Sequence, residues 1–84
     1  MNVVIYSTTD CPYCKMLKGY LTEKSVSYTE KIIDKEPAAQ EEMANLSGGF
    51  MGTPFTVITK EDGTQVKVEG FDKPKVDEAL GLKS

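Results

Sequence analysis

The first third of this chain changes from a strand pattern to a helix pattern and back, and this order restricts the fold more than any other feature. Val3–Tyr6 is a short apolar run typical of a buried strand. Apolar residues then recur three and four positions apart, which predicts a helix over about 12–24. Val26–Ile33 alternates in its first part, as strands do. Elements of these lengths predict a βαβ unit with parallel strands and a right-handed crossover.

The rest of the chain predicts a second helix, a hairpin and a third helix. The expected elements are a helix over Ala38–Leu46 ended by Ser47-Gly48-Gly49, a loop over Phe50–Pro54, strands over Phe55–Thr59 and Gln65–Glu69, and a final helix carrying Val76, Ala79 and Leu80. Asp62-Gly63 between the last two strands is typical of a hairpin turn. The order β-α-β-α-β-β-α predicts an α/β fold with a mixed four-stranded sheet and helices on both faces. Eighty-four residues fit one domain, residues 1–84.

Charge and hydropathy argue against two classes of partner. The net charge is −3 and all ten basic residues are lysines, whereas a nucleic-acid binder normally has a basic surface, so we expect no nucleic-acid partner. No apolar run approaches the roughly 20 residues of a membrane span, so we expect no membrane partner. The opening residues MNVVIYS lack the basic start and cleavage site of a secretory signal, and we therefore expect a cytoplasmic location. We also expect the protein to be a monomer.

Both cysteines of the chain, Cys11 and Cys14, lie where the first strand gives way to the first helix. A disulfide closing so short a loop removes little chain entropy and would be a poor staple. A closed zinc site needs four ligands, usually Cys or His, and this chain has two Cys and no His, so we expect no metal within one chain. A metal site shared between two copies of the chain, such as a bridging iron–sulfur cluster, remains an alternative. A redox pair is the strongest interpretation, because Cys-x-x-Cys near a βαβ pattern indicates a thioredoxin-like fold.

The helix start gives the two thiols different expected roles. Pro12 suits the first helical turn, which puts Cys11 at or just before the helix N-terminus and Cys14 one turn later on the same face. The partial positive charge of a helix N-terminus favours thiolate over thiol. We therefore expect Cys11 to be an exposed nucleophile of lower pKa. Cys14 is expected to be the shielded resolving thiol that attacks the mixed disulfide formed on Cys11.

Neighbouring side chains allow two interpretations each. Lys15 and Lys18 either add positive potential near the pair or are solvated lysines on the helix face. Asp10 would oppose thiolate formation if it lay close, or it helps to cap the helix. Tyr13 fits both the edge of the apolar stripe and a surface position between the cysteines.

Three motifs together resemble the dithiol glutaredoxins over nearly the whole chain. They are Cys11-Pro12-Tyr13-Cys14 after a strand, Thr53-Pro54 before a strand, and Gly70-Phe71-Asp72 before the last helix. The resemblance implies a thiol-disulfide oxidoreductase that reduces protein disulfides and glutathione mixed disulfides. It implies no bound cofactor, glutathione as the reducing co-substrate, and disulfide-containing or glutathionylated proteins as partners.

The resemblance also implies a set of binding residues: Tyr13, Thr53, Pro54, Gly70, Phe71 and Asp72. The family keeps a cis-proline where Pro54 stands, and a cis bond would bring the Thr53 backbone beside the cysteines to pair with an extended peptide. A trans Pro54 that merely opens a strand is the alternative. The region of Asp72 would hold the γ-glutamyl end of glutathione, with backbone N–H groups for the carboxylate and Asp72 for the amine. A plain helix cap at Asp72 is compatible with that role. Tyr13 would face the groove.

Two departures from the family pattern leave the electron donor open. Many glutaredoxins place a Lys shortly before the first cysteine, and Ser7-Thr8-Thr9-Asp10 has none. Gly70-Phe71 followed by Pro74 is similar to glutaredoxin-like redoxins, which take electrons from thioredoxin reductase and deliver them to ribonucleotide reductase. A third hypothesis is an iron–sulfur carrier held by Cys11 of two copies and two glutathione thiols. Pro12 and Tyr13 argue against it, since such carriers usually have a single active-site cysteine in more open surroundings.

Overall fold

The strand β1 (Asn2–Ser7) lies inside the sheet and pairs with a strand on each side. It runs parallel to β2 (Thr29–Ile32) and antiparallel to β3 (Phe55–Thr59). This arrangement comes from a computed structural model, which describes residues 2–49 and 52–81. The parallel pairing predicted for the βαβ unit is confirmed.

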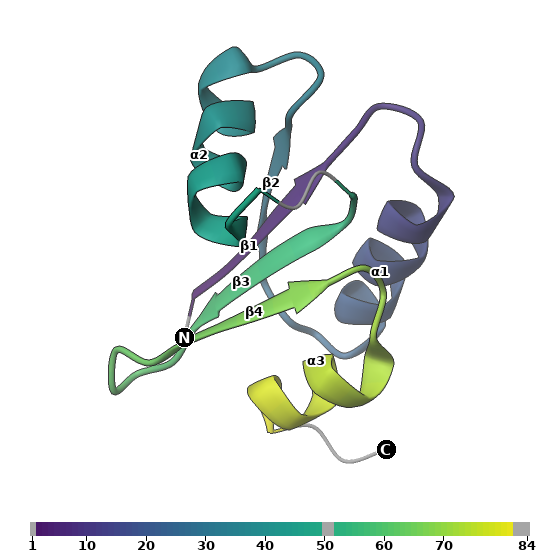
Figure 1. The fold of residues 1–84 in the computed structure, drawn as a ribbon. Helices are drawn as coiled ribbons and strands as arrows, with labels where there is room; N and C mark the ends of the chain where they lie inside the picture. Colours follow the sequence, from purple (N-terminus) through teal and green to yellow (C-terminus); the bar gives the residue numbers. More distant parts are fainter. Residues whose placement is uncertain (1, 50–51, 82–84) are drawn as a thin grey trace.

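The strand β4 (Gln65–Glu69) joins β3 through a tight turn. The N–H of Lys60 donates to the carbonyl of Thr64 at 2.8 Å, and Gly63 takes a φ of 90°, which glycine adopts without steric penalty. The Asp62 carboxylate accepts the N–H of Thr64 at 2.9 Å. The sheet order is β2-β1-β3-β4 (Figure 1), so the predicted hairpin and the mixed four-stranded sheet are confirmed.

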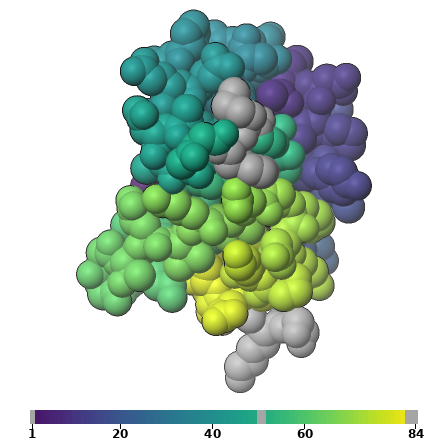
Figure 2. All heavy atoms as spheres, viewed as in Figure 1, coloured from purple at the N-terminus to yellow at the C-terminus, as the bar shows by residue number. Residues whose placement is uncertain are grey.

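Three helices are formed by the described residues: α1 (Pro12–Glu23), α2 (Pro37–Ser47) and α3 (Lys73–Leu80). Each has a proline in its first two positions, where the missing N–H has no helical partner to lose. Helix α2 covers one face of the sheet, and α1 and α3 cover the other, as predicted (Figure 1). In the space-filling view, the hairpin and α3 (green to yellow) form the lower half of the molecule beneath α2 (Figure 2). Within the described part of the chain, no helix is both long enough and apolar enough to cross a membrane.

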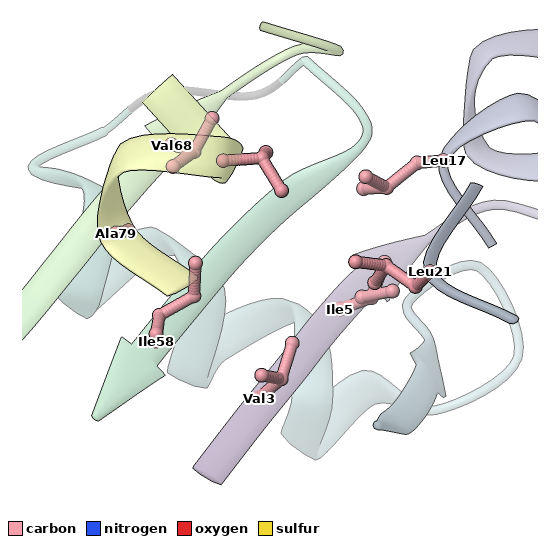
Figure 3. Close-up of a cluster of buried hydrophobic side chains, with 8 residues drawn as sticks. Val3, Ile5, Leu17, Leu21, Ile58, Val68 and Ala79 are labelled. Carbon is pink, nitrogen blue, oxygen red and sulfur yellow. The ribbon is translucent and has the colours of Figure 1, made fainter. Parts of the chain in front are cut away.

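The side chains of β1 alternate between two hydrophobic clusters, one on each face of the sheet. Val3 and Ile5 belong to the first cluster and Tyr6 to the second. The first cluster, between the sheet and helices α1 and α3, consists of Val3, Ile5, Leu17, Leu21, Ile58, Val68, Val76 and Ala79 (Figure 3). The second, between the sheet and α2, consists of Tyr6, Ile33, Ala39, Met43, Phe55 and Val57. Because both faces are covered, the central strands are nearly continuous apolar runs.

The second strand is shorter than predicted. It begins at Thr29, so 26–28 of the predicted strand Val26–Ile33 lie in the connection from α1. The N–H of Val26 donates to the carbonyl of Leu21 at 2.9 Å, which holds this segment against the end of the helix. Val26 and Tyr28 pack on the first cluster from there. The apolar alternation therefore reflects burial outside the sheet.

The other predicted boundaries agree closely with the structure. The helices predicted over about 12–24 and over Ala38–Leu46 correspond to α1 and α2, and Gly48 ends α2 with a φ of 70°. The predicted loop Phe50–Pro54 includes Phe50 and Met51, which lie outside the described residues. Its last three residues, 52–54, form neither helix nor strand.

Replacement of Leu17 by alanine tests how α1 is held on the sheet. Leu17 is 0% exposed in the first cluster, so Leu17→Ala should lower the free energy of unfolding by about 2–5 kcal/mol. Met16 is the next residue on the same helix but is 54% exposed, and Met16→Ala should stay within about 0.5 kcal/mol of the parent. Urea unfolding followed by circular dichroism measures both variants. Equal losses in the two variants would contradict this packing.

Candidate active site

Cys11 is the N-cap of α1, and its sulfur takes part in the cap. The Sγ atom of Cys11 accepts the backbone N–H of Cys14 at 3.2 Å, which satisfies one of the N–H groups that a helix start leaves without a partner. The two cysteines form a disulfide, with their Cα atoms 5.2 Å apart. The predicted place of the pair at the helix start is therefore confirmed. The interpretation of Asp10 as the cap is wrong, because the chain enters the helix one residue later and Asp10 is exposed.

The disulfide is less accessible than predicted. Cys11 is 6% exposed and Cys14 1%, so the prediction of an exposed Cys11 is wrong for the oxidised pair, although Cys11 is the more accessible of the two. One cause is Thr53, whose hydroxyl lies 3.5 Å from the Cys11 sulfur. Tyr13 between the cysteines is 61% exposed, which confirms its surface position and excludes a core role.

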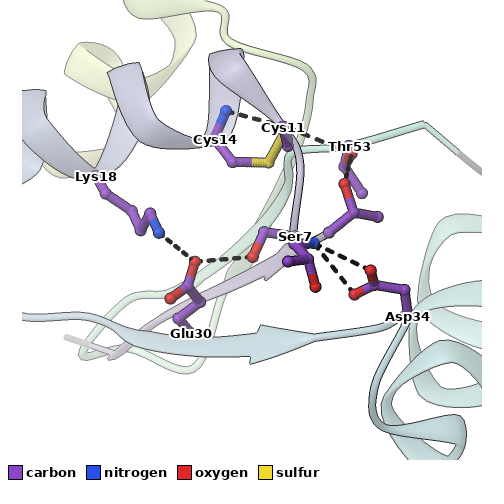
Figure 4. The surroundings of a disulfide bond; sticks show 9 residues. Ser7, Cys11, Cys14, Lys18, Glu30, Asp34 and Thr53 are labelled. Carbon is purple, nitrogen blue, oxygen red and sulfur yellow. Dashed lines mark hydrogen bonds and ion pairs between the residues drawn. A yellow bond between two sulfur atoms is a disulfide. The ribbon is translucent and has the colours of Figure 1, made fainter.

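The segment before β3 lies directly beside the disulfide. The Thr53–Pro54 peptide bond is cis, as predicted, and Pro54 is buried while Thr53 is half-buried. The Thr53 hydroxyl donates to the Cys11 sulfur at 3.5 Å, and the hydroxyl of Thr8 lies 3.5 Å from that of Thr53 (Figure 4). The structure thus brings the second motif to the first, although 42 residues separate Thr53 from Cys11.

The third motif is attached to the second through the backbone. The N–H of Gly70, at a φ of 76°, donates to the carbonyl of Pro54 at 2.8 Å. Asp72 is the N-cap of α3, where its Oδ1 atom accepts the N–H of Lys75 at 3.3 Å, so the helix-cap interpretation is confirmed. Phe71 is half-buried and packs on the first cluster. The binding roles of these residues remain predictions.

Tyr20 connects α1 to the third motif. Its hydroxyl donates to the buried carboxylate of Asp77 on α3, and this hydrogen bond raises the pKa of Tyr20 to about 12. The Tyr20 ring lies 6.3 Å from the ring of Phe71, centroid to centroid. The helix that begins with Cys11 is thereby joined to the segment that leads into α3.

A polar network beneath the disulfide was not predicted. Glu30 of β2 accepts the hydroxyl of the fully buried Ser7 at 2.8 Å and pairs with Lys18 of α1 at 2.6 Å (Figure 4). Burial raises the pKa of Glu30, but the hydrogen bonds from Lys18 and Ser7 outweigh it, so the pKa lies below its usual value. Lys18 is therefore an ion-pair partner, whereas Lys15 is exposed. The sequence offered one signal for this network, which is the polar Ser7 at the end of an apolar run.

Asp34 restrains the loop that leads to Cys11. Both carboxylate oxygens of Asp34, just after β2, lie 3.2 Å from the N–H of Thr9 (Figure 4). These hydrogen bonds lower the pKa of Asp34. Because Thr9 lies two residues before Cys11, the contact holds the approach to the helix start, and it was also missed from the sequence.

Comparison with known proteins identifies the family. The family model for glutaredoxin matches residues 3–62. The chain belongs to the glutaredoxin family. The glutaredoxin-like protein NrdH of Lactococcus lactis subsp. cremoris is 38% identical over 60 residues, which cover 71% of this chain and 78% of that protein. Glutaredoxin 3 of Escherichia coli is 47% identical over 47 residues, covering 56% and 57% of the two chains. Glutaredoxins are thiol-disulfide oxidoreductases, and the cysteine pair of this glutaredoxin is its redox pair.

A solved structure confirms the fold of this glutaredoxin. The crystal structure of the thioredoxin-like protein BC3987 superimposes with a TM-score of 0.79 at 30% identity. The match covers 94% of this chain and 100% of that chain. The predicted thioredoxin-like fold is therefore confirmed.

The ion pair beneath the disulfide predicts a dependence of stability on pH. Because the pKa of Glu30 is lower in the folded than in the unfolded protein, its carboxylate stabilises the fold above the unfolded pKa of about 4.3. This contribution disappears as the pH falls through the folded pKa. Glu30→Gln should therefore lower the free energy of unfolding at pH 7 by no more than about 1 kcal/mol, since the pair is partly exposed, and the difference should be smaller at pH 3.

Urea unfolding at the two pH values measures this difference. Glu41→Gln, which neutralises an exposed glutamate on α2, is the matched control and should behave like the parent at both. A Glu30→Gln deficit that is as large at pH 3 as at pH 7 would show that the charge of Glu30 contributes nothing.

Proposed function

We propose that this glutaredoxin reduces protein disulfides and glutathione mixed disulfides, and that glutathione reduces it in turn. The observation that carries the proposal is the position of the Cys11 sulfur as the cap of α1, where it accepts the N–H of Cys14 at 3.2 Å. A helix N-terminus favours a negative charge on that atom. The Thr53 hydroxyl lies 3.5 Å from that sulfur, and Gly70 is hydrogen-bonded to the carbonyl of the next residue, Pro54, so the second and third motifs are connected at the site.

The reaction proceeds by thiol–disulfide exchange. The Cys11 thiolate attacks one sulfur of the substrate disulfide, forming a mixed disulfide and releasing the other sulfur as a thiolate. The Cys14 thiolate then attacks the Cys11 sulfur, which releases the second substrate thiolate and closes the Cys11–Cys14 disulfide. One glutathione thiolate reopens this bond by attacking Cys11. A second removes the first as glutathione disulfide, so two electrons are transferred in all.

The binding residues take roles that their observed contacts permit. The Thr53 backbone pairs with the extended glutathione peptide beside Cys11. Asp72 receives the amino group of the γ-glutamyl end through Oδ2, because Oδ1 accepts the N–H of Lys75. The exposed ring of Tyr13 contacts the substrate that is bonded to Cys11.

Serine variants of the two cysteines separate their roles. Cys11→Ser should reduce both activities by at least about a hundredfold, because serine is a poor nucleophile at neutral pH. Cys14→Ser should keep the reduction of glutathionylated peptide, which needs Cys11 alone, and lose the reduction of protein disulfides. Both activities are measured by NADPH oxidation coupled through glutathione reductase. Activity that survives in Cys11→Ser would refute the assignment.

A second candidate function differs in its electron donor. The protein would take electrons from thioredoxin reductase and deliver them to ribonucleotide reductase. The similarity to the glutaredoxin-like protein NrdH, over 78% of that protein, favours this alternative. So does the segment Ser7–Asp10, which has no lysine to meet a glutathione carboxylate.

Reduction of the oxidised protein by each donor distinguishes the two candidates. We expect glutathione to reduce the Cys11–Cys14 disulfide at least about tenfold faster than NADPH with thioredoxin reductase does, as followed by mass spectrometry after alkylation. Asp72→Asn keeps a good helix cap but removes the charge for the glutathione amine, so it should slow reduction by glutathione and leave reduction by the reductase unchanged. Reduction by the reductase alone would refute the glutathione proposal and support the alternative.

A further inference from the structure

Three side chains from different parts of the chain form a row that ends at the Cys11 sulfur. The hydroxyl of Thr53 donates to this sulfur at 3.5 Å, and the hydroxyl of Thr8 lies 3.5 Å from that of Thr53. A hydroxyl has one proton to donate. When Thr53 directs its proton to sulfur, the proton between the two hydroxyls must therefore come from Thr8. We therefore infer that donation runs from Thr8 to Thr53 to Cys11.

The surroundings strengthen a neutral hydrogen bond at this place. Thr8 and Thr53 are half-buried and Cys11 is 6% exposed, and limited access of water makes hydrogen bonds electrostatically stronger. The two lysines nearest in sequence to the cysteine pair have other surroundings: Lys18 is paired with Glu30 at 2.6 Å, and Lys15 is exposed to solvent. The same sulfur also accepts the N–H of Cys14 at 3.2 Å. Two neutral donors thus point at the sulfur that must carry the charge.

We propose that the Thr53 side chain is a catalytic hydrogen-bond donor that stabilises the Cys11 thiolate, and that Thr8 positions it. The inference rests on the proposed role of Cys11 as the nucleophile. No proton is transferred, since the hydroxyl keeps its proton and donates it to the charged sulfur. The Thr53 hydroxyl donates this hydrogen bond whenever Cys11 is a thiolate. Cys11 is a thiolate before it attacks a disulfide and again when it is released from a mixed disulfide. This role belongs to the hydroxyl and is separate from the backbone role of Thr53 in peptide binding.

Variants that differ only in the hydroxyl test the proposal. Thr53→Val has the same shape without the donor and should raise the pKa of Cys11 by about half a unit to one unit. Thr53→Ser keeps the hydroxyl and should retain the parent value. Thr8→Val leaves Thr53 without its partner and should give a smaller shift in the same direction. The pKa is measured in the reduced protein from the pH dependence of iodoacetamide alkylation, with the modified cysteine assigned by mass spectrometry.

A buried threonine on β3 provides the matched control. Thr56 is 1% exposed, and its hydroxyl has no hydrogen-bond partner among the described residues, so Thr56→Val should leave the pKa of Cys11 unchanged. Circular dichroism checks that each variant is folded.

Three outcomes would overturn the proposal: no shift in Thr53→Val, a shift in Thr53→Ser as large as in Thr53→Val, or an equal shift in the Thr56→Val control. If the parent pKa is low and Thr53→Val does not change it, only the hydroxyl role fails. If the parent pKa is that of an ordinary thiol, near 8.5, the nucleophile of the proposed function fails with it.

Discussion

The packing of α1 on β1 is the constraint from which the position of the cysteine pair follows. Leu17 and Leu21 are fully buried in the first cluster, so the helix can neither rotate nor slide without exposing apolar surface or opening a cavity. This packing fixes the rotation of α1 and its position along the sheet. The first turn of the helix therefore lies just beyond the end of β1, and Cys11 is its N-cap. The sulfur then meets the N–H of Cys14 in a region of partial positive charge. The chemistry of the site is therefore a consequence of hydrophobic burial one and two turns further along the helix.

The electrostatics of the site come from dipoles more than from side-chain cations. The chain has ten lysines and no arginine. Lys18 of α1 is close to the cysteines in sequence, but its charge is paired with that of Glu30. Within residues 2–49 and 52–81, the donors that reach the Cys11 sulfur are the backbone N–H of Cys14 and the Thr53 hydroxyl. Such short-range donors are screened by salt far less than exposed charges are. Stabilisation of the thiolate by this arrangement should accordingly persist at high ionic strength.

Local patterns predicted the order of the elements well, because each helix and strand buries a face that matches its own period. The start of β2 was missed because Val26 and Tyr28 are buried in a connection, where alternation has the same appearance as in a strand. At the site, motifs predicted the cysteine pair and the cis bond at Pro54. They did not predict the contact of Ser7 with Glu30, 23 residues away, because such a pair depends on the register of the sheet. The low exposure of Cys11 depends in the same way on how a distant loop packs beside it.

The central claim is that Cys11, and not Cys14, is the activated thiol. Its most direct test is brief alkylation of the fully reduced, unmutated protein with limiting iodoacetamide at pH 6, followed by peptide mapping. An ordinary thiol with a pKa near 8.5 is scarcely ionised at that pH, so only an activated thiol reacts quickly. We predict that the label appears on Cys11 at least about tenfold ahead of Cys14. Equal labelling of the two cysteines, or no labelling of either, would contradict the account.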